Sequence, residues 1–156
     1  MASHGVRKLG LITGIFMLLF LFIDTLLPAS AFVYIAVIPT TIPRLFYVWG
    51  YTDGAVATSM LSLTWPNCII AWLTTIFFLF AAVMTISACT PGSLSANSKR
   101  LFGIATMFCF VQAAFYIILI GLSTVASLFF FLVGPGFYIL ILFGVLNIIS
   151  WVKAGN

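Results

Sequence analysis

Long apolar runs separated by short polar breaks dominate the sequence. Four of the runs have about the 20 apolar residues that a helix needs to cross the hydrocarbon core of a bilayer. A helix also satisfies its own backbone hydrogen bonds, which the bilayer interior requires. The sequence therefore predicts an all-α membrane protein, a four-transmembrane-helix bundle forming one domain over residues 1–156. The predicted spans are residues 9–27, 66–88, 101–122 and 127–152, with an outer loop at 28–65 and an inner loop at 89–100.

Turn and cap residues agree with these boundaries. Pro66 suits the first turn of the second span, and Pro91 with Gly92 breaks the second span from the third. Ser98 suits the N-cap of the third span. The run at 9–27 is longer than the 7–15 residue hydrophobic region of a signal peptide, so we expect it to be retained as a span.

The outer loop is apolar and has the composition of β-strands, because its first parts are rich in Val, Ile, Tyr, Phe and Trp. Asp53-Gly54 is a tight-turn pair, so residues 45–51 and 55–63 are predicted to pair as a short β-hairpin. Side-chain alternation then places three aromatic residues on one face of the first strand. They are Tyr47, Trp49 and Tyr51.

These three aromatic side chains need a cover, and two covers agree with the sequence. The side chains rest at the level of the lipid headgroups, where Trp and Tyr are favoured, or they bind a partner protein, since exposed apolar patches mark interfaces. Trp65 and Trp151 lie at predicted span ends on opposite sides, and we interpret them as lipid-anchoring residues of the aromatic belts.

The composition supports the membrane assignment. Hydrophobic residues make up 64% of the chain and charged residues 5%, with a mean hydropathy of +1.31. Soluble domains have about 45–50% apolar and about 25% charged residues. A water-soluble domain of this size could not bury so much apolar surface, so the lipid bilayer is the expected solvent.

The cations predict the orientation. Given four spans, five of the six Lys and Arg residues fall on one side, and only Arg44 falls on the other. This is the positive-inside pattern, and it places both termini on the cytosolic side or the equivalent matrix or stromal side. The five are Arg7, Lys8, Lys99, Arg100 and Lys153.

This plan of four helices, cytosolic ends and a strand-forming first outer loop resembles the claudin-type tetraspan family in outline. The first loop of that family carries a Trp-Gly-Leu-Trp stretch followed by paired cysteines. The present loop instead has VWGYTDG and a single cysteine, Cys68, at its end.

The polar residues inside the predicted spans include Asp24, Gln112 and Asn147. A charge in hydrocarbon costs several kcal/mol and marks a functional group by default, so the three are candidates for a polar path. The alternative is structural. Asp24 lies in the outer half of its span and is within reach of water or Arg44, while Gln112 and Asn147 suit hydrogen bonds between helices.

A second candidate feature interrupts the fourth span at Gly134, Pro135 and Gly136. Proline removes a backbone hydrogen bond and kinks a helix, and broken helices mark binding sites in transporters. The motif is therefore interpreted as a kink, either static or acting as a hinge.

The chain lacks the groups that other function classes require. It has two Asp, no Glu and one His, so we expect no catalytic site and no enzyme activity. Structural zinc needs about four Cys or His ligands at close spacing, so neither a metal nor another cofactor is expected. The three cysteines are predicted to be free thiols, and six scattered cations do not make a nucleic-acid surface.

Two functions remain. The first is a non-catalytic structural or accessory subunit of a larger membrane protein assembly, in which apolar helix faces and the aromatic outer loop contact partner proteins or further copies of the chain. The second is a small proton- or ion-coupled transporter or channel that uses Asp24 and the Pro135 break. The sequence favours the first, because a four-helix bundle buries only one stripe of each apolar helix.

Overall fold

The computed structural model describes residues 2–26, 35–37, 44–53, 56–59, 68–90, 96–121 and 134–154. Helices occupy most of these residues, which confirms the prediction of a largely helical protein. The described helices are α1 (Ala2–Leu26), α2 (Cys68–Ser87), α3 (Ala96–Gly121) and α5 (Pro135–Lys153).

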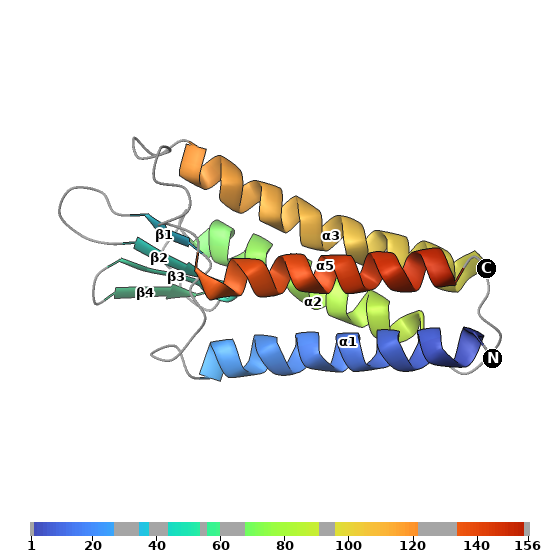
Figure 1. Cartoon of the computed structure of the whole chain (residues 1–156). Helices are drawn as coiled ribbons and strands as arrows, with labels where there is room; N and C mark the ends of the chain where they lie inside the picture. Colours follow the sequence, from blue (N-terminus) through green and yellow to red (C-terminus); the bar gives the residue numbers. More distant parts are fainter. Residues whose placement is uncertain are drawn as a thin grey trace.

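The four described helices run side by side, with a small sheet at one end and both chain termini at the other (Figure 1). We call these the sheet end and the terminal end. The helices contact one another in the cyclic order α1, α2, α3, α5, and the contact that closes the ring, between α1 and α5, is the sparsest. The order follows the chain, and the long connection from α1 to α2 carries the sheet.

The sheet has four antiparallel strands in sequential order: β1 (Ile35–Val37), β2 (Arg44–Tyr47), β3 (Gly50–Asp53) and β4 (Val56–Ser59). The predicted single strand over 45–51 is wrong, because a two-residue turn at Val48 and Trp49 divides it into β2 and β3. Gly50 completes this turn with a φ of 147°, a conformation that residues with a Cβ rarely adopt.

Each helix buries one stripe with heptad-like spacing. On α3 the stripe includes Phe102, Ala105, Cys109, Gln112 and Tyr116, all buried. This spacing of three and four residues keeps one face of a helix toward its neighbours. The opposite faces carry large apolar side chains in the open: Phe16 and Phe22 on α1 and Ile118 on α3 are each 58% exposed.

Glycines set the distance between α1 and α2. A Cβ on Gly14 would lie 2.5 Å from Ile86 Cγ1 and 3.2 Å from the Ile86 backbone nitrogen. A Cβ on Gly10 would lie 2.6 Å from Cys89 Sγ and 2.7 Å from Phe102 Cζ. The GxxxG pair therefore forms a packing face on which backbones approach closely, as small residues allow in membrane helices.

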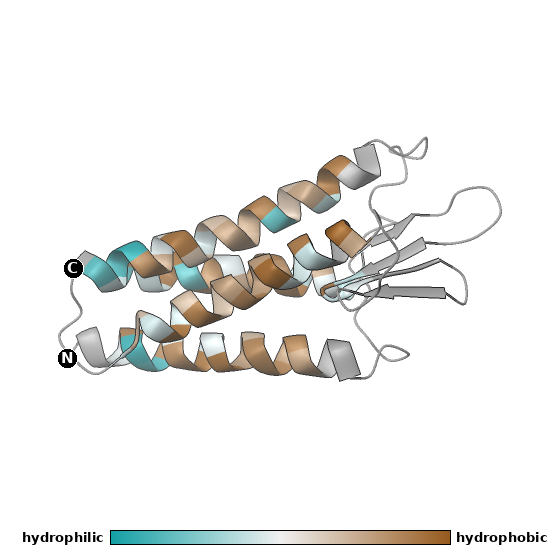
Figure 2. Ribbon diagram, turned by 180° about the vertical axis from the view of Figure 1, so that it is seen from behind, coloured by the Kyte–Doolittle hydropathy of each residue, from teal (hydrophilic) through white to brown (hydrophobic). Residues whose placement is uncertain are grey.

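Three of the described helices are long and apolar enough to cross a membrane: Gly5–Phe22 of α1, Asn97–Ile118 of α3 and Pro135–Lys153 of α5. Trp72–Ser87 of α2 is a shorter apolar stretch. Figure 2 shows apolar residues along the length of the helices and hydrophilic residues gathered mainly at the terminal end. The prediction of several membrane-length helices is confirmed.

The helix α5 begins at Pro135, within the motif Gly134, Pro135 and Gly136. Gly134 is its extended N-cap, with φ −88° and ψ 172°. Proline suits this first helical position, where its missing N–H would have no partner within the helix. Residues 127–133 lie outside the described part of the chain, so the kink at this motif stays a prediction.

We predict that Gly14→Ala destabilises the protein by about 1–3 kcal/mol, the usual cost of overpacking a well-packed site. The new methyl group collides with Ile86, whose backbone cannot move aside without shifting α2. Thermal unfolding in detergent, followed by circular dichroism, measures the change.

Gly5→Ala is the matched control on the same helix, because nothing lies within 4 Å of a Cβ at Gly5. This control is expected to be neutral or slightly stabilising, since alanine favours helix over glycine. Equal unfolding midpoints for the two variants would contradict the close approach of α1 and α2.

Candidate functional site

The β2–β3 turn is inserted between the helices at the sheet end. Tyr47, Val48 and Trp49 are 5%, 0% and 4% exposed, and the rings of Tyr47 and Trp49 stack with centroids 5.0 Å apart and planes at 6°. The turn belongs to the same hydrophobic core as Phe78 on α2 and Tyr116 on α3. We call this region the turn socket.

Hydrogen bonds from two helices hold the turn in its socket. The Thr75 hydroxyl on α2 donates to the Val48 carbonyl at 3.0 Å, and the Tyr116 hydroxyl on α3 donates to the Tyr47 carbonyl at 3.1 Å. Gln112 on α3 donates to the Thr74 carbonyl at 3.2 Å and lies 3.5 Å from the Tyr116 hydroxyl. The socket thus joins α2, α3 and the sheet through the backbone carbonyls of Tyr47, the last residue of β2, and Val48 in the turn.

Two buried polar atoms in this region have no hydrogen-bond partner in the structure: Nε1 of Trp49 and Oε1 of Gln112. One is a donor and the other an acceptor. A buried group of this kind costs about 1–3 kcal/mol when it stays unpaired.

The cover of the aromatic residues differs from both predicted covers. Tyr47 and Trp49 are covered by α2 and α3 of the same chain rather than by headgroups or a partner. The turn at Val48 and Trp49 causes the difference, because it directs both rings toward the helices. The side chains of Tyr51 and Trp65 lie outside the described part of the structure.

A second polar layer lies closer to the terminal end. Asn147 on α5 is fully buried, and its Oδ1 lies 2.8 Å from the hydroxyl of Thr85 on α2. Its Nδ2 donates to the Phe143 carbonyl at 3.1 Å and lies 3.9 Å from the sulfur of Met17 on α1. Asn147 therefore connects three helices across the centre of the bundle.

An apolar layer separates Gln112 from Asn147. Their partners on α2, Thr74 and Thr85, are about 16 Å apart at 1.5 Å per residue. Phe78 lies between these two threonines on α2. Its ring is 6.0 Å from Phe20 on α1 and 6.0 Å from Phe143 on α5.

Phe20 and Phe143 close the triangle of rings at 6.1 Å. Phe78 is fully buried, and Phe20 and Phe143 are 8% and 7% exposed. The structure thus places two of the three predicted path residues in separate layers, each with hydrogen-bond partners of its own.

Asp24 lies in the last turn of α1, at the sheet end, and Arg44 lies on β2 at the same end. The structure describes the backbone of both residues but not their side chains. The predicted contact of Asp24 with Arg44 or water therefore stays a prediction.

Cations gather at the terminal end, on the first turns of α1 and α3 and the last turn of α5. Trp151 on α5 is 40% exposed at this end, next to Gly103 of α3, where a Cβ would lie 3.6 Å from the indole. A partly exposed Trp among cations at a helix end is typical of a membrane interface. The cations are Arg7, Lys8, Lys99, Arg100 and Lys153.

The three cysteines are free. Cys68 and Cys89 lie at opposite ends of α2, and Cys109 is buried in α3. Burial raises the pKa of the Cys89 thiol, and the nearby Arg7 guanidinium opposes this shift more weakly. Among the described residues, no three His, Cys, Asp or Glu side chains are grouped as metal ligands would be.

Comparisons with protein-family models, with curated protein sequences and with solved structures find no match for this chain. The outline resemblance to the claudin-type plan therefore stays an expectation drawn from the sequence.

We predict that Thr75→Val and Tyr116→Phe each loosen the turn socket. Each substitution keeps the side-chain shape but removes a hydroxyl that donates a hydrogen bond to the Val48 or the Tyr47 carbonyl. The expected cost is about 1–3 kcal/mol for each substitution. Trypsin provides the measurement, because Arg44 is the only Lys or Arg between Lys8 and Lys99. Cleavage there is expected to become about 5- to 150-fold faster where it follows local opening.

Thr106→Val is the matched control. Thr106 is also a buried threonine, but its hydroxyl donates to the Phe102 carbonyl of its own helix at 2.9 Å. This substitution is expected to leave cleavage at Arg44 unchanged. Equal acceleration by Thr106→Val and Thr75→Val would show that the socket hydrogen bonds do not hold the sheet.

Proposed function

We propose that all four described helices cross a membrane and that both termini lie on its cytosolic, matrix or stromal side. The length of α2 supports this, because its 20 residues span about 30 Å as a helix, the thickness of a hydrocarbon core. The cations support the orientation, since those of α1, α3 and α5 share the terminal end, whereas Arg44 lies at the sheet end.

In this membrane the protein acts as a non-catalytic structural or accessory subunit of a larger assembly. The observation that carries the proposal is the use of its buried polar groups. Tyr116 and Thr75 hold the sheet, and Gln112, Asn147 and Thr85 join helices. These groups serve cohesion of the fold, which a scaffold needs.

The apolar layer weighs against the transporter alternative. An ion moving between the Gln112 and Asn147 layers would have to pass the rings of Phe20, Phe78 and Phe143, whose centroids are about 6 Å apart. Desolvating a charge there costs several kcal/mol.

The sparse α1–α5 contact supplies a surface for a neighbour. A groove of about 500 Å³ runs along it, and large apolar side chains stand open beside it, Phe16 at 58% and Leu142 at 53% exposure. The transmembrane helix of another subunit suits this groove. Its side chains would insert between those of α1 and α5, as side chains do where two helices pack. The residues that line it are Leu9, Ile12, Thr13, Phe16, Leu19, Phe20, Ile139, Leu142, Phe143 and Leu146.

The orientation predicts that tags at the N-terminus and the C-terminus lie on the same face of the membrane. Protease protection of both tags in sealed vesicles, tested from inside and outside, measures this. Tags on opposite faces would contradict the four-span arrangement, because an even number of crossings returns the chain to its starting side.

The subunit proposal predicts that gentle solubilisation yields a particle heavier than the 17.0 kDa chain, with a second component at fixed stoichiometry. Leu142→Trp is expected to break up this particle, because the larger ring fills the groove. Val83→Trp is the matched control on α2, since Val83 is 43% exposed and does not line the groove. Native electrophoresis and multi-angle light scattering provide the measurement.

Two outcomes would contradict this function. One is a wild-type protein that stays a single chain under the gentlest conditions. The other is a proton or cation flux through reconstituted vesicles that Asp24→Asn abolishes, which would support the transporter instead.

A further inference from the structure

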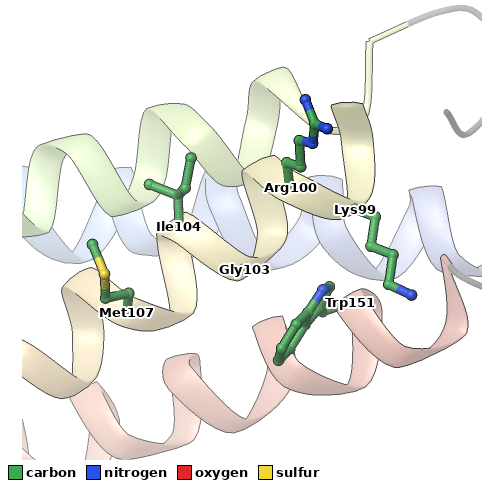
Figure 3. Close-up of a pocket in the computed structure, with 6 residues that line it drawn as sticks. All are labelled: Lys99, Arg100, Gly103, Ile104, Met107 and Trp151. Atoms are coloured by element: carbon green, nitrogen blue, oxygen red, sulfur yellow. The ribbon is translucent and has the colours of Figure 1, made fainter. Parts of the chain in front are cut away.

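A pocket of about 500 Å³ opens between α3 and α5 at the terminal end. Figure 3 shows it from the side: Lys99 extends from α3 toward α5, Arg100 extends to the other side of α3, and the Trp151 indole lies next to Gly103. The residues that line it are Lys99, Arg100, Gly103, Ile104, Met107 and Trp151.

The part of the pocket nearest the terminal end suits a phosphate group. Lys99 and Arg100 are exposed cations in the first turns of α3, and the indole N–H of Trp151 is a further donor. Charge-assisted hydrogen bonds from ammonium and guanidinium groups are among the strongest contacts that a phosphate makes. Both acidic residues of the chain, Asp24 and Asp53, belong to elements of the sheet end, so neither Asp lies on the elements that form this pocket.

The part of the pocket farther from the terminal end is apolar. It is formed by the side chains of Ile104 and Met107, which are 37% and 54% exposed. From Lys99 to Met107 the wall extends about 12 Å along α3 at 1.5 Å per residue. A soluble anion would cover the cations and leave this wall open, whereas an acyl chain attached to the phosphate covers both parts.

We propose that this pocket binds an anionic phospholipid, with its phosphate on Lys99 and the Trp151 indole, the positive charge of Arg100 nearby, and one acyl chain along Ile104 and Met107. The absence of a side chain at Gly103 leaves room for the Trp151 indole, which would lie 3.6 Å from a Cβ at this position. Basic pockets between membrane helices on the cytosolic or matrix side bind anionic lipid headgroups. The inference rests on the membrane crossing of α3 and α5 but not on the role of the protein as a subunit.

The test compares two lipids with the same acyl chains, palmitoyl-oleoyl phosphatidylglycerol and palmitoyl-oleoyl phosphatidylcholine. Each is titrated onto the intact protein in a neutral detergent, and native mass spectrometry counts the bound lipids. Phosphatidylglycerol is expected to be retained in preference to phosphatidylcholine. Lys99→Gln is expected to weaken its retention about fivefold, and Lys99→Gln with Arg100→Gln about 25-fold, from the usual contribution of a cation near anionic lipid.

Two further variants separate the parts of the pocket. Lys8→Gln is the matched control, since Lys8 is an exposed cation of the same end that does not line the pocket; it is expected to leave retention unchanged. Gly103→Leu is expected to lower retention of phosphatidylglycerol while both cations stay, because its side chain displaces the Trp151 indole, which would lie 3.6 Å from a Cβ at this position. Unfolding midpoints in lipid-free detergent verify that each variant is folded before its retention is counted.

Three results would overturn the proposal: equal retention of the two lipids, an equal loss with Lys8→Gln and Lys99→Gln, or full retention in Gly103→Leu. Displacement of the lipid by millimolar glycerol 3-phosphate would also overturn it, because a soluble phosphate would then be the better ligand. The native particle mass is measured separately, so failure of the lipid site leaves the test of the subunit role unaffected.

Discussion

The hydroxyls of Thr75 and Tyr116 hold the β2–β3 turn between the helices, and the placement of the sheet depends on them. Tyr47 and Val48 are buried, and buried backbone carbonyls need partners within the protein. The helices supply the donors at 3.0 and 3.1 Å. Because the turn also carries the stacked rings of Tyr47 and Trp49, two hydrogen bonds and one aromatic pair anchor the sheet at the end of the bundle.

The helices meet under a different constraint, since apolar side chains gain little from leaving lipid for one another. Close contact and hydrogen bonds must then hold them, and both occur in layers. Gly10 and Gly14 bring α1 against α2, the Phe20, Phe78 and Phe143 rings fill the centre, and polar groups lie on either side of the rings. The side chains of each layer contact particular residues on the other helices, and these contacts fix the relative register of the helices.

The sequence predicts the helices well because membrane length and apolar composition are local properties, and α1, α2 and α3 begin or end close to the predicted spans. It does not predict features that depend on contacts with distant parts of the chain. Tyr-Val-Trp reads as a strand by composition, and only the positive φ of Gly50 and the donors on α2 and α3 make it a turn. Gly-Pro-Gly suits a kink and a helix start equally. The sequence identifies Gln112 and Asn147 as polar but cannot assign them to separate layers, because their partners come from other helices.

The same glycines explain why the bundle is asymmetric. Gly10 and Gly14 of α1 face α2 and α3, and Gly144 of α5 faces α3, where a Cβ would lie 3.1 Å from the Phe110 ring. Glycines that allow close approach are thus used on two of the four seams, α1–α2 and α3–α5. The α1–α5 seam instead has large side chains: the rings of Phe20 and Phe143 meet across it at 6.1 Å, and Phe16 and Leu142 turn outward. The groove there follows from where the glycines are placed, so a neighbouring helix can close the ring without any rearrangement of the other three seams.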